Sequence, residues 1–329
     1  MYNRTEIILE AYPYEFTDMI KGRGAYLCHC PDGSRKILKE FAGSVSKAEL
    51  LDRFLIYLKE RGCVTEQILY TKEGQVLFTD TDDTRYYLRT WYEGRECDTR
   101  NREDVLCAVR RLAQFHIDTA GFSEELPPVM CRTPDFLEQE YERHTKELRK
   151  VRNYIHTKKK RNEFETDFLK ECNYYLNQAT EAADRLREAA SSDSGQYYGI
   201  CHGDYSQHNL LFTAHGPVII NYERFCQDAY ISDFAHFFRK IMEKHNWNTG
   251  LGMDMIRAYD KVRRLGGWEM QQLCVRMSYP EKFWKVANHY FNSKKSWANC
   301  RDGEKLGRIC AQERERAEFL KILDEAARG

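Results

Sequence analysis

Residues Ile200 to Phe212 read Ile-Cys-His-Gly-Asp-Tyr-Ser-Gln-His-Asn-Leu-Leu-Phe and are the most informative segment for the fold. It places Asp204 in a His-Gly-Asp turn and Asn209 five positions later, directly before an apolar run. A His-Gly-Asp sequence by itself is consistent with an ordinary turn in which the aspartate caps its own backbone. The asparagine at this spacing and the apolar runs on both sides favour a functional loop between two short strands.

A second apolar run follows a Gly216-Pro217 turn and ends in Asn221-Tyr222-Glu223. Because side chains alternate along a strand, a strand over 218–223 would point Asn221 and Glu223 to the same side. We therefore expect these two residues to face the loop of Asp204 and Asn209.

The spacing of Asp204 and Asn209 matches phosphoryl-transfer catalytic loops, in which a catalytic Asp and a metal-binding Asn lie five positions apart. Such transfer requires an oriented hydroxyl, clamped phosphates and neutralised charge. We expect Asp204 to accept the proton of the hydroxyl. Asn209, Asn221 and Glu223 can offer oxygen ligands to a divalent ion.

The composition excludes several classes of protein. The chain has 329 residues, 42% of them hydrophobic, with 51 Lys plus Arg against 51 Asp plus Glu. This balance gives no reason to expect nucleic acid or an anionic membrane as a partner. No apolar run approaches the roughly 18 residues of a membrane-spanning helix, and the first residues show no signal peptide. We expect synthesis in the cytoplasm.

Twelve cysteines are scattered along the chain. In a chain of this size they need not form a disulfide framework, and we expect free thiols. Cys28-His29-Cys30 is the one tight group, for which a metal site and buried thiols are the two alternatives. The absence of a second ligand pair at zinc-finger spacing favours buried thiols.

Residues 1–93 are predicted to form a small β-rich lobe with one helix. Strand-like runs cover 25–30 and 34–41 around a Pro-Asp-Gly turn, and a hairpin is expected at 75–79 and 85–90. Ser46 and Glu49 have capping-box spacing at the start of the helix. The lobe boundary is placed at Glu93-Gly94-Arg95.

Residues 94–329 are predicted to be mainly helical. Between residues 135 and 190, two apolar series with 4-3 spacing predict a long antiparallel helical hairpin. A basic run, Lys158 to Arg161, marks its tip, as a solvated loop or as a docking patch for an acidic partner. Asp233 opens a later helix, either as a plain N-cap or as support for the 200–223 loop.

His202-Gly203-Asp204 with Asn209 resembles the signature of aminoglycoside and choline kinase-like phosphotransferases. Three downstream segments are similar to clostridial CotS-type spore coat proteins: Asn221 to Phe225, Asp233 to Lys244 and Tyr279 to Lys285. The resemblance covers nearly the whole chain. It implies a protein-kinase-like α+β fold with two lobes, 1–93 for nucleotide and 94–329 carrying the catalytic-type loop.

The resemblance also implies nucleotide contacts in the small lobe, with ATP and Mg²⁺ as cofactors. Gly22 and Gly24 would form a reduced phosphate loop, in which Leu27 stands at the third glycine position. Lys39 would hold the α- and β-phosphates, although an exposed strand lysine is the alternative. Glu49 would be its ion-pair partner, unless it only serves the capping box. Trp91 would lie on the adenine side.

One departure from the family pattern concerns activity. Active members have Asp where this chain has Asn221, and a neutral ligand should weaken Mg²⁺ binding. Two hypotheses follow: a phosphotransferase that moves the γ-phosphate of ATP to an unknown small molecule, or a pseudokinase that is a structural component of the coat. In either case we expect a protein made in the mother cell that joins the spore coat, with other coat proteins as partners.

Overall fold

A computed structural model describes residues 4–22, 24–188, 194–292 and 298–328. The chain divides into two compact units. The smaller unit comprises Met1–Asp98, Gln114–Glu125 and His202–Phe225, and the larger unit comprises Thr99–Ala113, Leu126–Cys201 and Cys226–Gly329. A single boundary at residue 93 differs from this division, because the structure groups the 202–225 loop with the N-terminal strands.

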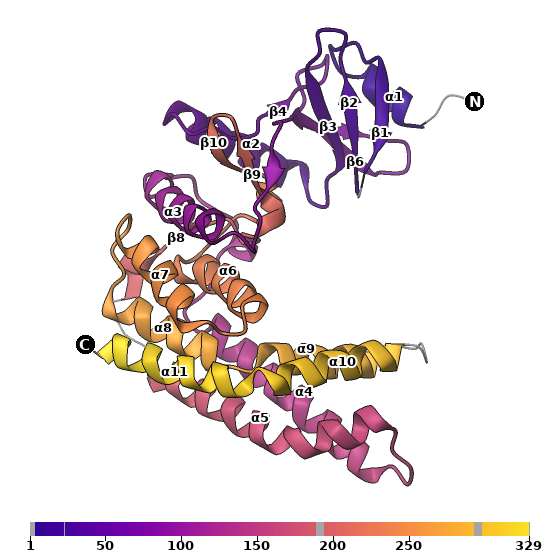
Figure 1. The fold of residues 1–329 in the computed structure, drawn as a ribbon. Helices are drawn as coiled ribbons and strands as arrows, with labels where there is room; N and C mark the ends of the chain where they lie inside the picture. Colours follow the sequence, from indigo (N-terminus) through magenta and orange to yellow (C-terminus); the bar gives the residue numbers. More distant parts are fainter. Residues whose placement is uncertain (1–3, 23, 189–193, 293–297, 329) are drawn as a thin grey trace. The chain divides into compact units, whose positions relative to one another are not determined.

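An antiparallel sheet forms the centre of the smaller unit (Figure 1). Its strands follow the order β1-β2-β3-β6-β4, and β5 pairs with β6. The bounds are β1 Asp18–Lys21, β2 Ala25–His29, β3 Arg35–Glu40, β4 Ile68–Leu69, β5 Phe78–Thr79 and β6 Arg85–Thr90. The predicted strands around Pro31-Asp32-Gly33 and the predicted hairpin with Asp83 at its tip are confirmed.

Two helices accompany this sheet, one more than the sequence predicted: α1 Arg4–Glu10 and α2 Val45–Glu60. The capping-box assignment is wrong, because Ser44, and not Ser46, is the N-cap and accepts the backbone N–H of Lys47. Buried leucines and Phe54 line one face of α2. Cys28 lies among apolar side chains of the sheet core, where burial raises its pKa to about 11. This environment favours the buried-thiol interpretation.

A second sheet of the smaller unit carries the loop of interest. It joins β10 Gly216–Ile219, β9 Leu210–Thr213 and β7 Arg95–Glu96 in that order. An isolated bridge links Thr65 to Ile219. This pairing with segments near residues 65 and 95 explains why the loop belongs to the N-terminal unit.

The larger unit is mainly helical. A two-stranded sheet joins β8 Tyr198–Cys201 to β11 Cys226–Ala229. The helices are α4 Phe136–Thr157, α5 Glu163–Glu188, α6 Ile231–Lys244, α7 Thr249–Asp260, α8 Gly267–Ser278, α9 Glu281–Asn292, α10 Ala298–Ala311 and α11 Glu313–Arg328. Helix α3, Arg102–Asp118, passes from this unit into the smaller one.

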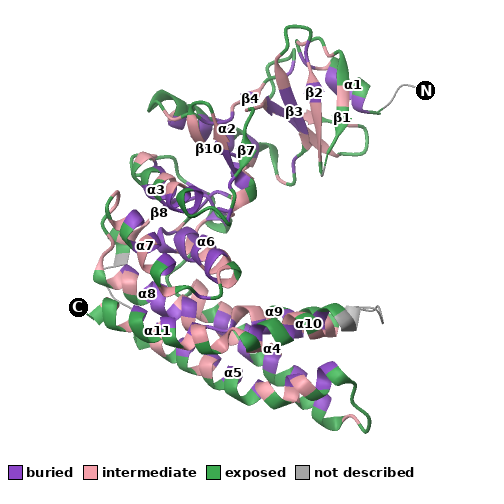
Figure 2. Cartoon of the chain, in the orientation of Figure 1, coloured by how far each residue is buried: buried purple, intermediate pink, exposed green. Residues whose placement is uncertain are grey.

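The predicted hairpin is confirmed as α4 and α5, which run side by side in Figure 1. Leu148 and Tyr175 are buried on their packed faces. Figure 2 shows buried residues alternating with intermediate and exposed residues along both helices. Phe283 of α9 stacks on Tyr175, with ring centroids 4.2 Å apart, and extends this core.

Among the described residues, no helix is both long and apolar enough to span a bilayer. No disulfide joins any of the eleven cysteines whose side chains are described, as predicted. The twelfth, Cys300, lies outside the described side chains.

Candidate functional site

The loop that carries Asp204 and Asn209 lies between β8 and β9 and is fixed by the buried side chain of His202. The Nε2 atom of His202 lies 3.0 Å from the carbonyl oxygen of Ile220, and its Nδ1 atom accepts the backbone N–H of Asp204 at 3.2 Å. This pattern requires that Nε2 carries the proton. The imidazole thus joins Asp204 to the strand end that precedes Asn221.

Gly203 permits the sharp turn before Asp204. Its φ is +75°, and an added Cβ would lie 2.1 Å from the carbonyl oxygen of Arg224. No other residue has room at this position, because the opposing atom belongs to the backbone. The glycine of the His-Gly-Asp motif is therefore required by the close approach of two loop segments.

Asp204, Asn209 and Asn221 are connected by hydrogen bonds. The Nδ2 atom of Asn209 donates to the backbone carbonyl of Asp204 at 2.8 Å. The Nδ2 atom of Asn221 donates to Oδ1 of Asn209 at 2.7 Å. The structure thus brings together three of the residues that the sequence selected.

Lys39 and Glu223 complete this group. The Nζ atom of Lys39 forms an ion pair with Glu223 and lies 3.4 Å from Oδ1 of Asn221. The hydroxyl of Tyr87, the cross-strand partner of Lys39, donates to the same carboxylate. Burial opposes ionisation of Glu223, but the charges of Lys39 and Arg89 and the hydrogen bonds of Lys39 and Tyr87 lower its pKa to about 2. The Glu223 carboxylate is therefore ionised at neutral pH.

The local geometry of Asn221 and Glu223 differs from the prediction. Strand β10 ends at Ile219, and Asn221 adopts a left-handed conformation with φ of +66°. Tyr222–Arg224 then forms a turn of 3-10 helix. Asn221 and Glu223 reach Lys39 through this turn, and the expected strand alternation was wrong.

Two residues that sequence reasoning missed hold this turn in place. Glu66 is 1% exposed and accepts the backbone N–H groups of Asn221 and Tyr222 at 2.9 and 3.3 Å. Arg89 is 5% exposed, forms an ion pair with Glu66 and donates to Oδ1 of Asn221 at 2.7 Å. The one available signal was the alternation of β6, which puts Arg89 on the same face as Tyr87.

The other residues selected from the sequence lie in the same unit. Gly22 and Gly24 form the turn between β1 and β2; Gly22 donates to the carbonyl of Ala25, which pairs with Lys39 across the sheet. Their neighbour Arg23 lies outside the described residues. Glu49 is exposed on α2, and the ion pair that the structure gives Lys39 is with Glu223. The buried indole N–H of Trp91 has no hydrogen-bond partner among the described residues.

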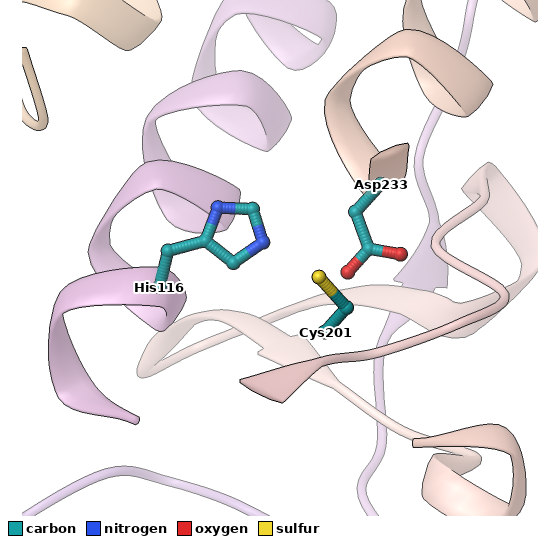
Figure 3. A group of neighbouring side chains, drawn as sticks. All are labelled: His116, Cys201 and Asp233. Atoms are coloured by element: carbon teal, nitrogen blue, oxygen red, sulfur yellow. The ribbon is translucent and has the colours of Figure 1, made fainter. Parts of the chain in front are cut away.

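Asp233 belongs to the larger unit. The N-cap of α6 is Tyr230, so Asp233 lies in the first turn of the helix and the plain N-cap interpretation is wrong. Figure 3 shows its carboxylate beside the thiol of Cys201, within 4.8 Å. Burial and the carboxylates of Asp233 and Asp228 raise the pKa of that thiol. Cys201 directly precedes His202 in the sequence, and the role of Asp233 as support for the loop stays a prediction.

A family model described as spore coat putative kinase YutH matches residues 6–323 of this chain. The chain belongs to this family of spore coat putative kinases. Spore coat protein S of Bacillus subtilis (strain 168) is 21% identical over 304 residues, which cover 89% of this chain and 85% of that protein. The predicted resemblance to CotS-type coat proteins is confirmed, whereas the clostridial branch stays a prediction.

Solved structures similar to this spore coat kinase family member are small-molecule kinases. An aminoglycoside phosphotransferase from Alicyclobacillus acidocaldarius subsp. acidocaldarius DSM 446 superposes with a TM-score of 0.84 at 18% identity, covering 98% of this chain and 96% of that one. An amicoumacin kinase in complex with AMP-PNP, Ca²⁺ and Ami gives a TM-score of 0.62 at 13% identity, covering 95% and 94%. These likenesses confirm the predicted kinase-like α+β fold.

The structurally similar amicoumacin kinase is in complex with a nucleotide analogue and a divalent ion. The oxygen atoms of the site in this chain can therefore be compared with what such an ion requires. Oδ1 of Asn221 faces the cations Arg89 and Lys39, and its Nδ2 faces Asn209. The carboxylate of Glu223 already accepts from Lys39 and Tyr87. Mg²⁺ requires several oxygens directed at one point. The three predicted metal ligands therefore do not fit a divalent ion in this arrangement.

Proposed function

We propose that this member of the spore coat kinase family binds a nucleotide through its kinase-like site and is impaired in phosphoryl transfer. It serves the spore coat as a folded component. The observation that carries this proposal is the neutral amide of Asn221, held between Arg89, Lys39 and Asn209. Phosphoryl-transfer sites of this class neutralise developing charge with metal ions at that position.

Three features support nucleotide binding. Lys39 lies on the central strand of the sheet, 30% of its side chain is exposed, and its cross-strand neighbour adjoins the Gly22–Gly24 turn. The buried indole N–H of Trp91 offers a donor to a ligand acceptor. The solved relatives include a spectinomycin phosphotransferase in complex with ADP, with a TM-score of 0.57.

Calorimetric titration with ADP tests the nucleotide part. We expect wild-type protein to bind ADP and the Lys39→Met variant to lose about tenfold or more in affinity, since hydrogen bonds to charged groups contribute about 1.5–3 kcal/mol. Lys59→Met, which removes an exposed lysine from α2, should bind like wild type. Absence of ADP binding in wild type would overturn this part.

A second candidate function is an active small-molecule phosphotransferase. It is favoured by Asp204, which His202 and Asn209 position as in a catalytic loop. Phosphate release from ATP separates the two candidates. We expect no turnover that depends on Asp204, so Asp204→Asn should match wild type. Turnover that Asp204→Asn abolishes would establish the active enzyme instead.

A further inference from the structure

The site contains a chain of amide hydrogen bonds that runs in one direction. Arg89 donates to Oδ1 of Asn221, Nδ2 of Asn221 donates to Oδ1 of Asn209, and Nδ2 of Asn209 donates to the carbonyl of Asp204. The donor-acceptor distances are 2.7, 2.7 and 2.8 Å. Every oxygen in this chain faces a donor.

The groups at the two ends of this hydrogen-bond series, the guanidinium of Arg89 and the carbonyl of Asp204, fix its donor-to-acceptor direction. A guanidinium can only donate, and a backbone carbonyl can only accept. Turning the Asn221 amide over would direct its NH₂ group at Arg89 and Lys39, so that donors would face donors. Turning Asn209 over would place its oxygen against the carbonyl of Asp204. Neither amide can therefore reverse without breaking the network.

Arg89, the first donor of this hydrogen-bond series, is held rigidly because Glu66 anchors it in the protein interior. Both residues are almost completely buried, and Glu66 also accepts the backbone N–H groups of Asn221 and Tyr222. Moving Arg89 away from Asn221 would also separate it from Glu66, and an unpaired buried charge strongly destabilises a protein. Position 221 thus has a permanent donor on one side.

An aspartate at position 221 would require a cation between its carboxylate and Asn209. One carboxylate oxygen could still accept from Arg89, but the other would face Oδ1 of Asn209 with no hydrogen between them. Two facing oxygens are stabilised by a cation, and a divalent ion takes carboxylate and amide oxygens as ligands. The asparagine removes this requirement, because its N–H group joins the two side chains.

We propose that the Asn221 amide replaces the divalent cation, so that this site is complete without metal and does not take one up. Because the proposed function assigns nucleotide binding to the same site, the nucleotide is then held without a divalent ion. Metal binding by residues 204, 209 and 221 can be measured without nucleotide.

Mn²⁺ titration followed by electron paramagnetic resonance tests this inference without nucleotide. We expect wild-type protein to bind no Mn²⁺ at this site, and the Asn221→Asp variant to bind one ion with an affinity at least about tenfold above the detection limit of the titration. Adding Asn209→Ala to that variant should abolish the gain. Asn101→Asp, which adds the same charge at an exposed residue, should remain like wild type.

Two outcomes would overturn the inference: wild type binds one Mn²⁺ that Asn209→Ala removes, or folded Asn221→Asp binds none. Thermal melting adds a measurement that does not require the variant to be stable. The melting temperature of wild type should be equal in Mg²⁺ and in EDTA, and a Mg²⁺-dependent rise that Asn209→Ala removes would contradict the inference. A failure of ADP binding would affect the proposed function and leave these metal results intact.

Discussion

The Glu223 carboxylate should make stability depend on pH. Burial opposes its ionisation, yet Lys39, Arg89 and Tyr87 lower its pKa from 4.5 to about 2. An acid whose pKa is depressed on folding stabilises the protein above its unfolded pKa, and this contribution is lost as pH falls from about 4.5 toward 2. The shift corresponds to about 3 kcal/mol at neutral pH.

Urea unfolding of wild type and Glu223→Gln between pH 7 and pH 3 measures this contribution. We expect the difference in unfolding free energy between them to be largest at neutral pH and to shrink below about pH 4.5. Lys39→Met should reduce the pH-dependent part of that difference, because it removes the ion-pair partner. A difference that stays constant over the whole range would contradict the assignment.

Some residues of the site could be selected from the sequence and others could not. Asp204 and Asn209 could be selected because their relation is local, five positions apart in one loop. Glu66 and Arg89 contact Asn221 although they lie 155 and 132 positions away in the sequence. Local sequence patterns do not predict contacts over such distances. Glu49 was selected by resemblance, although the apolar stripe of its helix lies on other residues.

The turn before Asp204 should tolerate no side chain. Gly203→Ala would place a Cβ 2.1 Å from the carbonyl oxygen of Arg224. Gly216→Ala is a matched control, because Gly216 also has a positive φ, of +98°, but open space around its Cβ position. We expect the control to cost about 1–2 kcal/mol of backbone strain.

Gly203→Ala should cost clearly more than this, since the backbone must also move. Unfolding in urea measures both variants, and equal losses of unfolding free energy for the two alanine variants would show that the close approach to Arg224 is not a constraint.

The end of strand β10 shows why one prediction from the sequence failed. Alternation along a strand cannot reveal that β10 ends at Ile219, because the left-handed Asn221 is held by Glu66 from another segment.

The α4–α5 hairpin followed directly from its apolar spacing, but its basic tip is more structured than a solvated loop. Lys158 forms an ion pair with Glu165, whose side chain is 1% exposed. Arg161 donates to the backbone carbonyls of Ile155 and His156. Lys159 and Lys160 are exposed, so these two residues are the part of the run available for docking.

Charge reversal should therefore distinguish neighbouring lysines. Lys158→Glu places a like charge beside the buried Glu165, and we expect it to lower the unfolding free energy by about 1–3 kcal/mol. Lys159→Glu makes the same change at an exposed residue and should remain within about 0.5 kcal/mol of wild type. Thermal or urea unfolding gives the comparison, and equal stability of the two variants would argue against the Lys158–Glu165 pair.

Across the chain, the kinase-like fold and the coat family could be inferred from sequence because a local motif and the downstream segments carry them. The division of the residues into two compact units could not be inferred from the sequence. Strand β7 pairs with β9, and Thr65 with Ile219, so segments far apart in sequence meet the 202–225 loop in one unit. Such pairing depends on tertiary contacts, which periodicity within one segment does not encode.

The proposed site uses the amide of Asn221 in place of a metal ion and still binds a nucleotide. Calorimetric titration of wild-type protein with ADP, once in excess EDTA and once in Mg²⁺, tests it most directly. We expect binding in both conditions, with dissociation constants that differ by less than about threefold. Binding that EDTA weakens more than about tenfold, and that Mg²⁺ restores, would contradict it.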